Sequence, residues 1–260
     1  MAAVKISVAG AGGRMGGAVI SEAVRTDGVE IAGLFEMAGH KAAGTEIEGV
    51  RVSESVADAS AQANVVVDFT SPRATLANAR YCAGAGRAMV IGTTGFTPAQ
   101  REELEELSGG FACVMAPNMS IGVNVLERLV SDAAAKLGDG FDIEVLEIHH
   151  AGKADAPSGT ALALARAAAA AGGRSLESAA VCSREGTGLA RGEKEIGIQS
   201  LRGGAVAGDH TVFFLSGGER LELSHRASDR GIFAAGAIRA AKWVCGKPAG
   251  MYGMKEVLGL

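Results

Sequence analysis

Cysteine is scarce in this sequence, and the few cysteines are far apart. The 260 residues contain four of them, Cys82, Cys113, Cys182 and Cys245, and no two form a CxxC pair. This spacing indicates neither a zinc ribbon nor a redox dithiol. We expect reduced, buried thiols, as is usual in a cytoplasmic protein.

Excess positive charge and long apolar runs are also absent. The net charge is −4 at neutral pH, whereas nucleic-acid-binding proteins usually carry a basic excess. No apolar run approaches the ~18 residues of a membrane span, and the alanine-rich stretch 161–173 is short and interrupted by Arg166. The N-terminal residues lack the layout of a signal peptide. We expect a cytoplasmic protein that binds neither membrane nor nucleic acid, although local positive sites can still attract an anionic substrate.

The first half of the chain alternates between buried strands and helices. A helix is predicted over Thr75–Ala85. Another is predicted to begin at Pro98, which suits the first helical position, with Thr97 as its N-cap. Strands are predicted at Val4–Ala9, Val29–Phe35, Asn64–Phe69, Ala88–Gly92 and Phe111–Ala116. This alternation is typical of a parallel sheet covered on both faces, a Rossmann-like doubly wound α/β fold.

The pattern changes near residue 120. Helices are expected at 121–137 and 160–171, and strands at 141–149, 195–201, 210–215 and 220–225. Three consecutive strands without a helix between them predict a second, α+β domain with a mixed open sheet. We expect the domains to be 1–119, completed by the C-terminal segment 230–260, and 120–229, with a mobile loop at 184–194.

A glycine-rich loop follows the first strand. It reads Gly10-Ala11-Gly12-Gly13-Arg14-Met15-Gly16 and departs from G-x-G-x-x-G because Met15 stands where the third glycine belongs. Glycines still permit a tight turn and a close approach to a pyrophosphate, and the helix N-terminus supplies amide donors. Between a strand and a helix, this loop predicts dinucleotide binding rather than a simple turn.

The residue at the end of the second strand bears on the choice of nucleotide. Glu36 can accept hydrogen bonds from the adenosine ribose of NADH and would repel a 2′-phosphate, and Met37 offers no cation. NADH is therefore the expected cofactor. NADPH stays possible because Arg14, His40 and Lys41 are close in sequence to this site.

Two further segments follow predicted strands, at the edge where open α/β sheets bind ligands. Backbone groups there, together with the Asn118 amide, are candidates to orient a nicotinamide ring, although ordinary turns have the same composition. The segments are Gly92-Thr93-Thr94-Gly95 and Ala116-Pro117-Asn118-Met119.

Most of the candidate proton-transfer and anion-binding residues lie between 147 and 161. His149 and His150 end a strand, Lys153 follows, and Ser158-Gly159-Thr160 opens a helix that Ser158 or Asp155 could cap. The free amides of a helix start, with a lysine beside them, indicate a carboxylate site next to proton-transfer groups. Structural histidines are the alternative. No metal is expected, because adjacent residues of a strand point to opposite faces.

This segment, and the whole chain with it, resembles the 4-hydroxy-tetrahydrodipicolinate (dihydrodipicolinate) reductase family. The distinctive motif is Glu147-Ile148-His149-His150-x-x-Lys153-x-Asp155-Ala156-Pro157-Ser158-Gly159-Thr160-Ala161. Further matching stretches are 8–16, 68–70, 90–96, 118–124, 183–186, 208–211 and 219–227.

The resemblance implies NAD(P)H-dependent reduction of an unsaturated cyclic dicarboxylate on the diaminopimelate route to lysine, by a homotetramer joined through its substrate-binding domain, 120–229. His149 would transfer a proton, with Lys153 as second proton donor and carboxylate partner. The substrate would be held by His150, Lys153, Ser158, Gly159 and Thr160. The nucleotide would be held by Gly10 to Met15 and Glu36, with Gly92 to Thr94 and Ala116 to Met119 near the nicotinamide. Met37 departs from the arginine of many members.

Two other functions remain open on the sequence. One is another Rossmann amino-acid or semialdehyde dehydrogenase, although a semialdehyde enzyme needs a catalytic cysteine in a strand-to-helix turn. The other is a regulatory protein that binds NADH without turnover, which would not need His149, His150 and Lys153 together. The sequence fits either the hydroxylated or the dehydrated ring as substrate.

Overall fold

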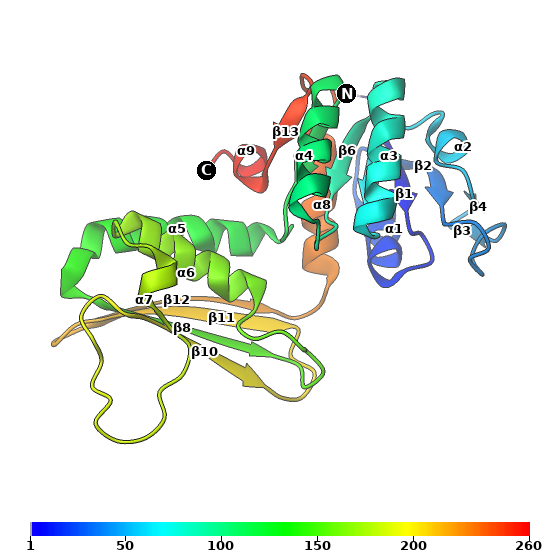
Figure 1. Cartoon of the computed structure of the whole chain (residues 1–260). Coiled ribbons are helices and arrows are strands. Elements are labelled where there is room, and N and C mark those ends of the chain that lie inside the picture. Colours follow the sequence, from blue (N-terminus) through cyan, green and yellow to red (C-terminus); the bar gives the residue numbers. More distant parts are fainter. Residues whose placement is uncertain (1) are drawn as a thin grey trace. The chain divides into compact units, whose positions relative to one another are not determined.

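The computed structural model describes residues 2–260, which fall into two compact units (Figure 1). The first unit extends to Ile121 and includes Arg230–Leu260, and the second is Gly122–Asp229. The chain therefore leaves the first unit and returns to it.

The first unit is built on a parallel sheet. In the described part of the chain its strand order is β13-β7-β6-β5-β1-β2-β4-β3, and β3 alone runs antiparallel to its neighbour. The strands are β1 (Val4–Ala9), β2 (Val29–Phe35), β3 (Glu46–Ile47), β4 (Val50–Ser53), β5 (Val65–Asp68), β6 (Ala88–Ile91), β7 (Ala112–Met115) and β13 (Gly250–Tyr252). The Rossmann-like prediction is confirmed.

Helices cover both faces of this sheet, which explains the uninterrupted apolar run in β5. Val65 and Val67 pack in one core with α1 and α8, whereas Val66 packs in the opposite core with α3 and α4. A strand buried on both faces needs no polar residue in alternation. The helices are α1 (Arg14–Arg25), α2 (Val56–Ser60), α3 (Pro72–Ala85), α4 (Pro98–Leu107), α8 (Gly231–Val244) and α9 (Met254–Leu258), with a 3₁₀ turn at Ser108–Gly110.

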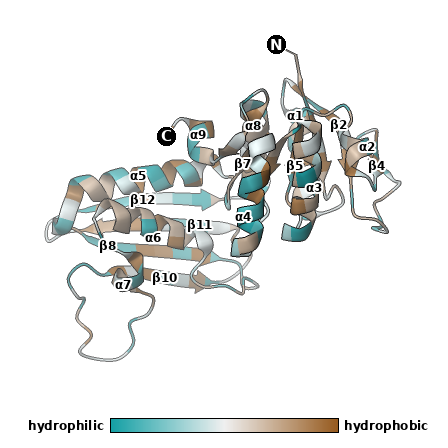
Figure 2. Cartoon of the chain, turned by 45° about the horizontal axis from the view of Figure 1, so that its top comes forward, coloured by the Kyte–Doolittle hydropathy of each residue, from teal (hydrophilic) through white to brown (hydrophobic). Residues whose placement is uncertain are grey.

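Side-chain caps set two of the helix starts. The N-cap predicted at Thr97 is confirmed, and reciprocal bonds with Gln100 make it a capping box. Helix α4 is largely teal in Figure 2 because its outer face is charged. Helix α3 begins at Pro72 rather than Thr75, because Ser71 accepts a hydrogen bond from the Ala74 amide.

The second unit packs helices against one face of a mixed sheet. Its strand order is β12-β11-β8-β10-β9, with β8 parallel to β10 and antiparallel to β11. Alternate residues of β8, Ile143 and Val145, meet Leu126 and Val130 of α5 in the core. The elements are α5 (Ile121–Leu137), a 3₁₀ turn at Gly138–Gly140, β8 (Asp142–His149), α6 (Gly159–Ala171), α7 (Leu176–Ala179), β9 (Ala180–Val181), β10 (Ile196–Arg202), β11 (Gly208–Leu215) and β12 (Arg220–Ala227).

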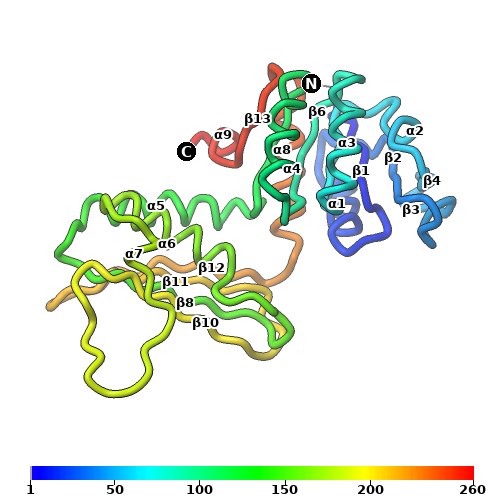
Figure 3. Tube along the Cα trace, in the orientation of Figure 1, coloured from blue at the N-terminus to red at the C-terminus, as the bar shows by residue number. Residues whose placement is uncertain are grey.

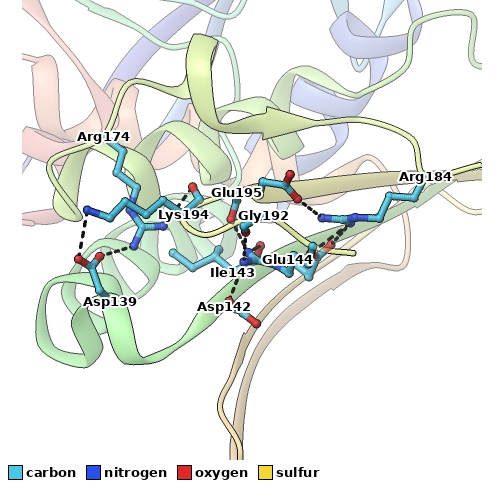
Figure 4. A network of polar contacts seen from close by, with 10 residues as sticks. Asp139, Asp142, Ile143, Glu144, Arg174, Arg184, Gly192, Lys194 and Glu195 are labelled. Atoms are coloured by element: carbon cyan, nitrogen blue, oxygen red, sulfur yellow. Dashed lines mark hydrogen bonds and ion pairs between the residues drawn. The ribbon is translucent and has the colours of Figure 1, made fainter. Parts of the chain in front are cut away.

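The segment between β9 and β10 forms a long loop without helix or strand (Figure 3). Its arginines bind carboxylates at the base of the loop, as the network in Figure 4 shows. Arg184 bonds to Glu195 at 2.8 Å and to Glu144, and Arg191 bonds to Asp142 at 2.6 Å and to Glu144 at 3.2 Å. These pairs join the two ends of the loop to the start of β8.

The expectation of four buried thiols is wrong in part. Cys82 and Cys113 are buried, and burial raises the pKa of each thiol to about 12. Cys245 is half-buried and Cys182 is exposed, because Cys182 lies in the loop beyond the short strand β9 rather than in a core. All four are free.

Residues 2–260 contain no helix that is long and apolar enough to cross a membrane. The longest helix, α5, has polar and charged residues along its length.

Helix α8 lies very close to the backbone after β7, and one glycine makes this possible. A Cβ on Gly236 would overlap the carbonyl oxygen of Met119. We expect Gly236→Ala to lower the free energy of unfolding by about 1–3 kcal/mol, since overpacking forces the backbone apart. Thermal unfolding should report this as a lower Tm.

The matched control is Gly84→Ala in α3, where no described atom lies within 4 Å of a new Cβ. That substitution should stabilise the protein by roughly 0.5–1 kcal/mol through helix propensity. Equal Tm values for the two variants would contradict the close approach at Gly236.

Candidate active site

The nucleotide-site residues predicted from the sequence lie at one edge of the parallel sheet. The loops after β1, β2, β6 and β7 all leave from carboxyl ends of parallel strands. Along the chain, the strand order runs one way from β1 to β2 and the other way from β5 to β7. Open α/β sheets bind ligands at such a reversal point.

The glycine loop has the close packing that a dinucleotide site requires. Gly10 has φ +67°, and its Cβ would lie 2.9 Å from Thr70. Gly13 caps α1, and a Cβ on Gly16 would overlap the Gly10 carbonyl. Gly16 thus allows the close helix–strand packing usually assigned to the third glycine, so Met15 does not disrupt the loop. These residues fit a nucleotide pyrophosphate.

Glu36 is tied to this loop. Its Oε1 accepts a hydrogen bond from the Gly12 amide at 2.9 Å, and its Oε2 accepts one from the Met37 amide at 3.2 Å. His40 Nδ1 lies 3.8 Å from Oε1, and the imidazole packs 2.7 Å from where a Gly12 Cβ would be. The Glu36 carboxylate therefore joins the glycine loop to the segment after β2.

Exposed side chains lie near Glu36 in the sequence and in the glycine loop. Met37 is 73% exposed, and Arg14 and Lys41 are also exposed. The side chain following the acidic residue is thus free to meet an adenosine, but it carries no charge.

A buried carboxylate organises the loop after β6. Asp68, at the end of β5, accepts hydrogen bonds from Asn78 at 2.8 Å, from the Thr70 hydroxyl at 2.6 Å and from Thr93 at 3.4 Å. Thr93 is consequently buried, whereas Thr94 is exposed. A Cβ on Gly92 would overlap the Phe69 ring. Tight packing fixes this segment.

The loop after β7 is anchored at both ends. The Ala116 amide donates to the Ile91 carbonyl at 3.2 Å, and Met119 is buried. Between them Pro117 is exposed, and Asn118 Oδ1 accepts a hydrogen bond from the Ser120 amide at 2.9 Å. The loop presents its middle residues at the same sheet edge as Thr94.

In the second unit, His149 is the last residue of β8 and is only 8% exposed. Its Nδ1 makes a short hydrogen bond to Glu147 Oε2, and its ring packs edge-on against His210, 5.1 Å between centroids. The other ring nitrogen, Nε2, faces Gly208, where a Cβ would stand 3.0 Å away. The Nδ1 atom is thus bound by Glu147, and the absence of a side chain at Gly208 leaves space beside Nε2.

Glu147 is completely buried and shared among three groups. Besides His149, it accepts hydrogen bonds from Arg202 at 2.8 and 2.9 Å and from the Ser158 amide at 3.1 Å. Burial acts to raise the pKa of Glu147, but the hydrogen bonds that it accepts, that from Arg202 first, outweigh burial and lower the pKa to about 2. The carboxylate is ionised at neutral pH.

Ser158 is the residue that caps α6. Its hydroxyl accepts a hydrogen bond from the Ala161 amide at 3.1 Å and shares another with His210 Nε2 at 3.1 Å. Because the side chain is 2% exposed and doubly bonded, it fixes the helix start rather than reaching outward. Gly159 is exposed, with no described atom near its Cβ position, so the first turn of α6 is open to an anion.

Lys153 and His150 lie in the turn before α6. Lys153 Nζ bonds to Asp155 Oδ1 at 2.7 Å, and this bond lowers the pKa of the Asp155 carboxyl. Asp155 does not cap the helix. His150 is half-buried, and its amide donates to the Val206 carbonyl at 2.8 Å.

Arg202 and His210 were given no role by the sequence analysis. His210 is buried, and burial, followed by the neighbouring His149, lowers its pKa to about 4, so its imidazole is neutral at neutral pH. Both residues reach the site only through strand pairing, Arg202 opposite His149 and His210 opposite Glu147. The sequence held two signals. Glu147 stands two residues before His149, on the same face of the strand, where a carboxylate needs a cation, and His210 lies in the matching stretch 208–211.

No group of three or more histidine, cysteine or acidic side chains in residues 2–260 is arranged to hold a metal ion.

Comparisons with known proteins identify the family of the chain. Residues 4–119 match the family model for the dihydrodipicolinate reductase N-terminus, and residues 122–258 match that for its C-terminus. The chain is 49% identical to the 4-hydroxy-tetrahydrodipicolinate reductase of Syntrophobacter fumaroxidans, over 99% of each chain. It is also 49% identical to that of Anaeromyxobacter dehalogenans, over 98% of each.

A solved structure has the same fold. Dipicolinate-bound dihydrodipicolinate reductase from Paenisporosarcina sp. TG-14 superposes with a TM-score of 0.79 at 23% identity, covering 98% of this chain and 100% of that one. Because both family models and the full-length relatives agree, the chain belongs to the dihydrodipicolinate reductase family, the NAD(P)H-dependent 4-hydroxy-tetrahydrodipicolinate reductases of lysine biosynthesis.

Proposed function

We propose that His149 and Lys153 carry the proton chemistry when this chain reduces 4-hydroxy-tetrahydrodipicolinate to tetrahydrodipicolinate, the reaction of its family. The observation that supports this most is the position of His149 beside the start of α6. Its ring and the Ser158 amide bind the same buried carboxylate. A proton-transfer group therefore adjoins an amide-lined anion site.

The net reaction adds one hydride and one proton to the substrate and releases water and the oxidised nucleotide. NADH or NADPH, when bound, supplies the hydride to the substrate ring. His149 delivers the proton from Nε2, the nitrogen that faces Gly208. Lys153 is the second proton donor: it protonates the departing hydroxyl, and the ring proton lost in that dehydration balances the proton that Lys153 gives.

The two substrate carboxylates are assigned to the start of α6 and the turn before it. Backbone amides at Gly159 and Thr160 bind one carboxylate with the aid of the helix dipole. Lys153 and His150 hold the other, with Lys153 exchanging Asp155 for the substrate. Ser158 contributes by capping the helix.

The nucleotide is assigned to the carboxyl edge of the parallel sheet. Gly10 to Met15 hold the pyrophosphate, and Glu36 holds the adenosine ribose. Gly92 to Thr94 and Ala116 to Met119 line the nicotinamide. NADH is the preferred cofactor, because Glu36 is fixed beside the glycine loop and Met37 supplies no charge for a 2′-phosphate.

The active form is proposed to be a cytoplasmic homotetramer assembled through the sheet of the second unit. Within residues 122–229 the helices cover one face of this sheet. The other face carries Leu146, Ile148 and Phe213, all half-buried, and Leu201, which is 50% exposed. An apolar face of this kind is typical of an oligomer interface.

Substitution of the proton-transfer residues tests the assignment. His149→Gln and Lys153→Ala should each lower turnover about 10²–10⁴-fold, the usual contribution of general acid catalysis, while the Kd for NADH stays unchanged. Lys136→Ala, an exposed lysine at the end of α5, is the control for loss of charge. Loss of NADH binding in the first two variants would place them in the nucleotide site instead. Wild-type protein that binds NADH without turnover would favour the regulatory function.

Cofactor preference follows from the residues at 36 and 37. We expect kcat/KM to be higher with NADH than with NADPH, and Met37→Arg to raise the NADPH value about tenfold or more, equivalent to ~1.4 kcal/mol. Met37→Leu should leave the ratio as it is. Equal or better use of NADPH by the wild type would contradict the Glu36 argument.

The assembly is checked by light scattering after size-exclusion chromatography. The expected mass is four times the chain mass of 26.2 kDa. Leu201→Lys should yield smaller species, because a charge would be buried in the interface. Val24→Lys, at an equally exposed position of α1, should remain tetrameric. A monomeric wild type would exclude the tetramer.

A further inference from the structure

We propose that the ion pair between the buried carboxylate of Glu147 and the half-buried guanidinium of Arg202 is the positioning device of the proton-transfer site. It holds the His149 ring, the first turn of α6 and the turn that carries Lys153 in one arrangement. This inference rests on the proposed function of His149 and adds two residues that do not themselves touch the substrate.

The pair is central because it is bonded to His149, to the start of α6 and to the turn before α6. Glu147 Oε2 binds the His149 ring, and Oε1 binds the Ser158 amide at the start of α6. Arg202 bonds to both carboxylate oxygens and donates to the Asp155 carbonyl at 2.7 Å. Since Asp155 holds Lys153, the pair reaches the lysine through one intermediate residue.

The negative charge of Glu147 has a specific effect on His149. A carboxylate at Nδ1 fixes a proton on that nitrogen, so Nε2 is the position that exchanges a proton with the substrate. A neutral side chain at 147 could keep the hydrogen bond but would lose this charge.

Arg202 offsets the energetic cost of burying the Glu147 carboxylate. A completely buried carboxylate without a cation costs several kcal/mol, and it would be neutralised by protonation instead. With two bonds to Glu147 and further bonds to the Leu201 and Asp155 carbonyls, the guanidinium is fixed in place. Arg202 thereby keeps Glu147 charged without removing it from His149.

The test compares Glu147→Gln with the double variant Glu147→Gln/Arg202→Met. The double variant removes both charges together, and buried ion pairs replaced in this way often leave proteins as stable as before. Both variants should bind NADH as the wild type does. If the pair positions His149, turnover of the double variant should be about 10–100-fold below wild type although its Tm matches that of the wild type.

The kinetic parameters distinguish positioning from structural support. Without the carboxylate at Nδ1 the His149 ring is free to turn and to take the other tautomer, so kcat should fall while the KM for the substrate stays near the wild-type value. Glu147→Asp, which keeps the carboxylate, should recover part of the wild-type kcat. A double variant with wild-type kcat and KM would overturn the proposal and leave the pair a structural one.

Two controls separate this inference from the proposed function. Glu144→Gln removes an arginine-paired carboxylate on the opposite face of the same strand, and turnover should not change. His149→Gln reports on the proposed function itself. If that variant keeps full turnover, the role of His149 fails; if it is inactive while the Glu147 double variant is fully active, only the role of the pair fails.

Discussion

The burial of one carboxylate constrains the second unit. Glu147 loses all contact with solvent, and the cost of desolvating it is offset only when Arg202, His149 and the Ser158 amide are all in place. These partners come from two strands and the start of a helix. The register of β10 on β8 and the docking of α6 are thus coupled to a single charge.

The same constraint explains why polar residues cluster on an otherwise apolar sheet face. Ile143, Val145 and Glu147 share the helix-covered face of β8, and the change from apolar to charged occurs where α6 begins. There the amides at the start of α6 need polar partners, and Glu147 accepts a hydrogen bond from one of them. One face of β8 therefore packs in the core at its start and carries the polar residues of the site at its end.

Much of this fold could be predicted from local sequence. Strands β1 and β2 and helix α5 have the predicted bounds, because a full apolar run or several helical turns define them. The short elements β4 and α2 were missed, since four or five residues hold too little periodic signal. The sequence also marked His149 and Lys153, which stand in one continuous motif. It did not reveal Arg202, which lies 55 residues from Glu147 and meets it only through strand pairing.

The return of the chain to its first unit has a consequence for biosynthesis. Ala234, Ala237, Ile238 and Ala241 of α8 belong to the same core as Val8 and Val65. That core cannot close until α8 has left the ribosome, whereas the second unit is continuous in sequence and is synthesised completely before α8. Domains fold as units during synthesis, so the unit that begins first is completed after the second unit, and its sheet remains uncovered by α8 until that helix emerges.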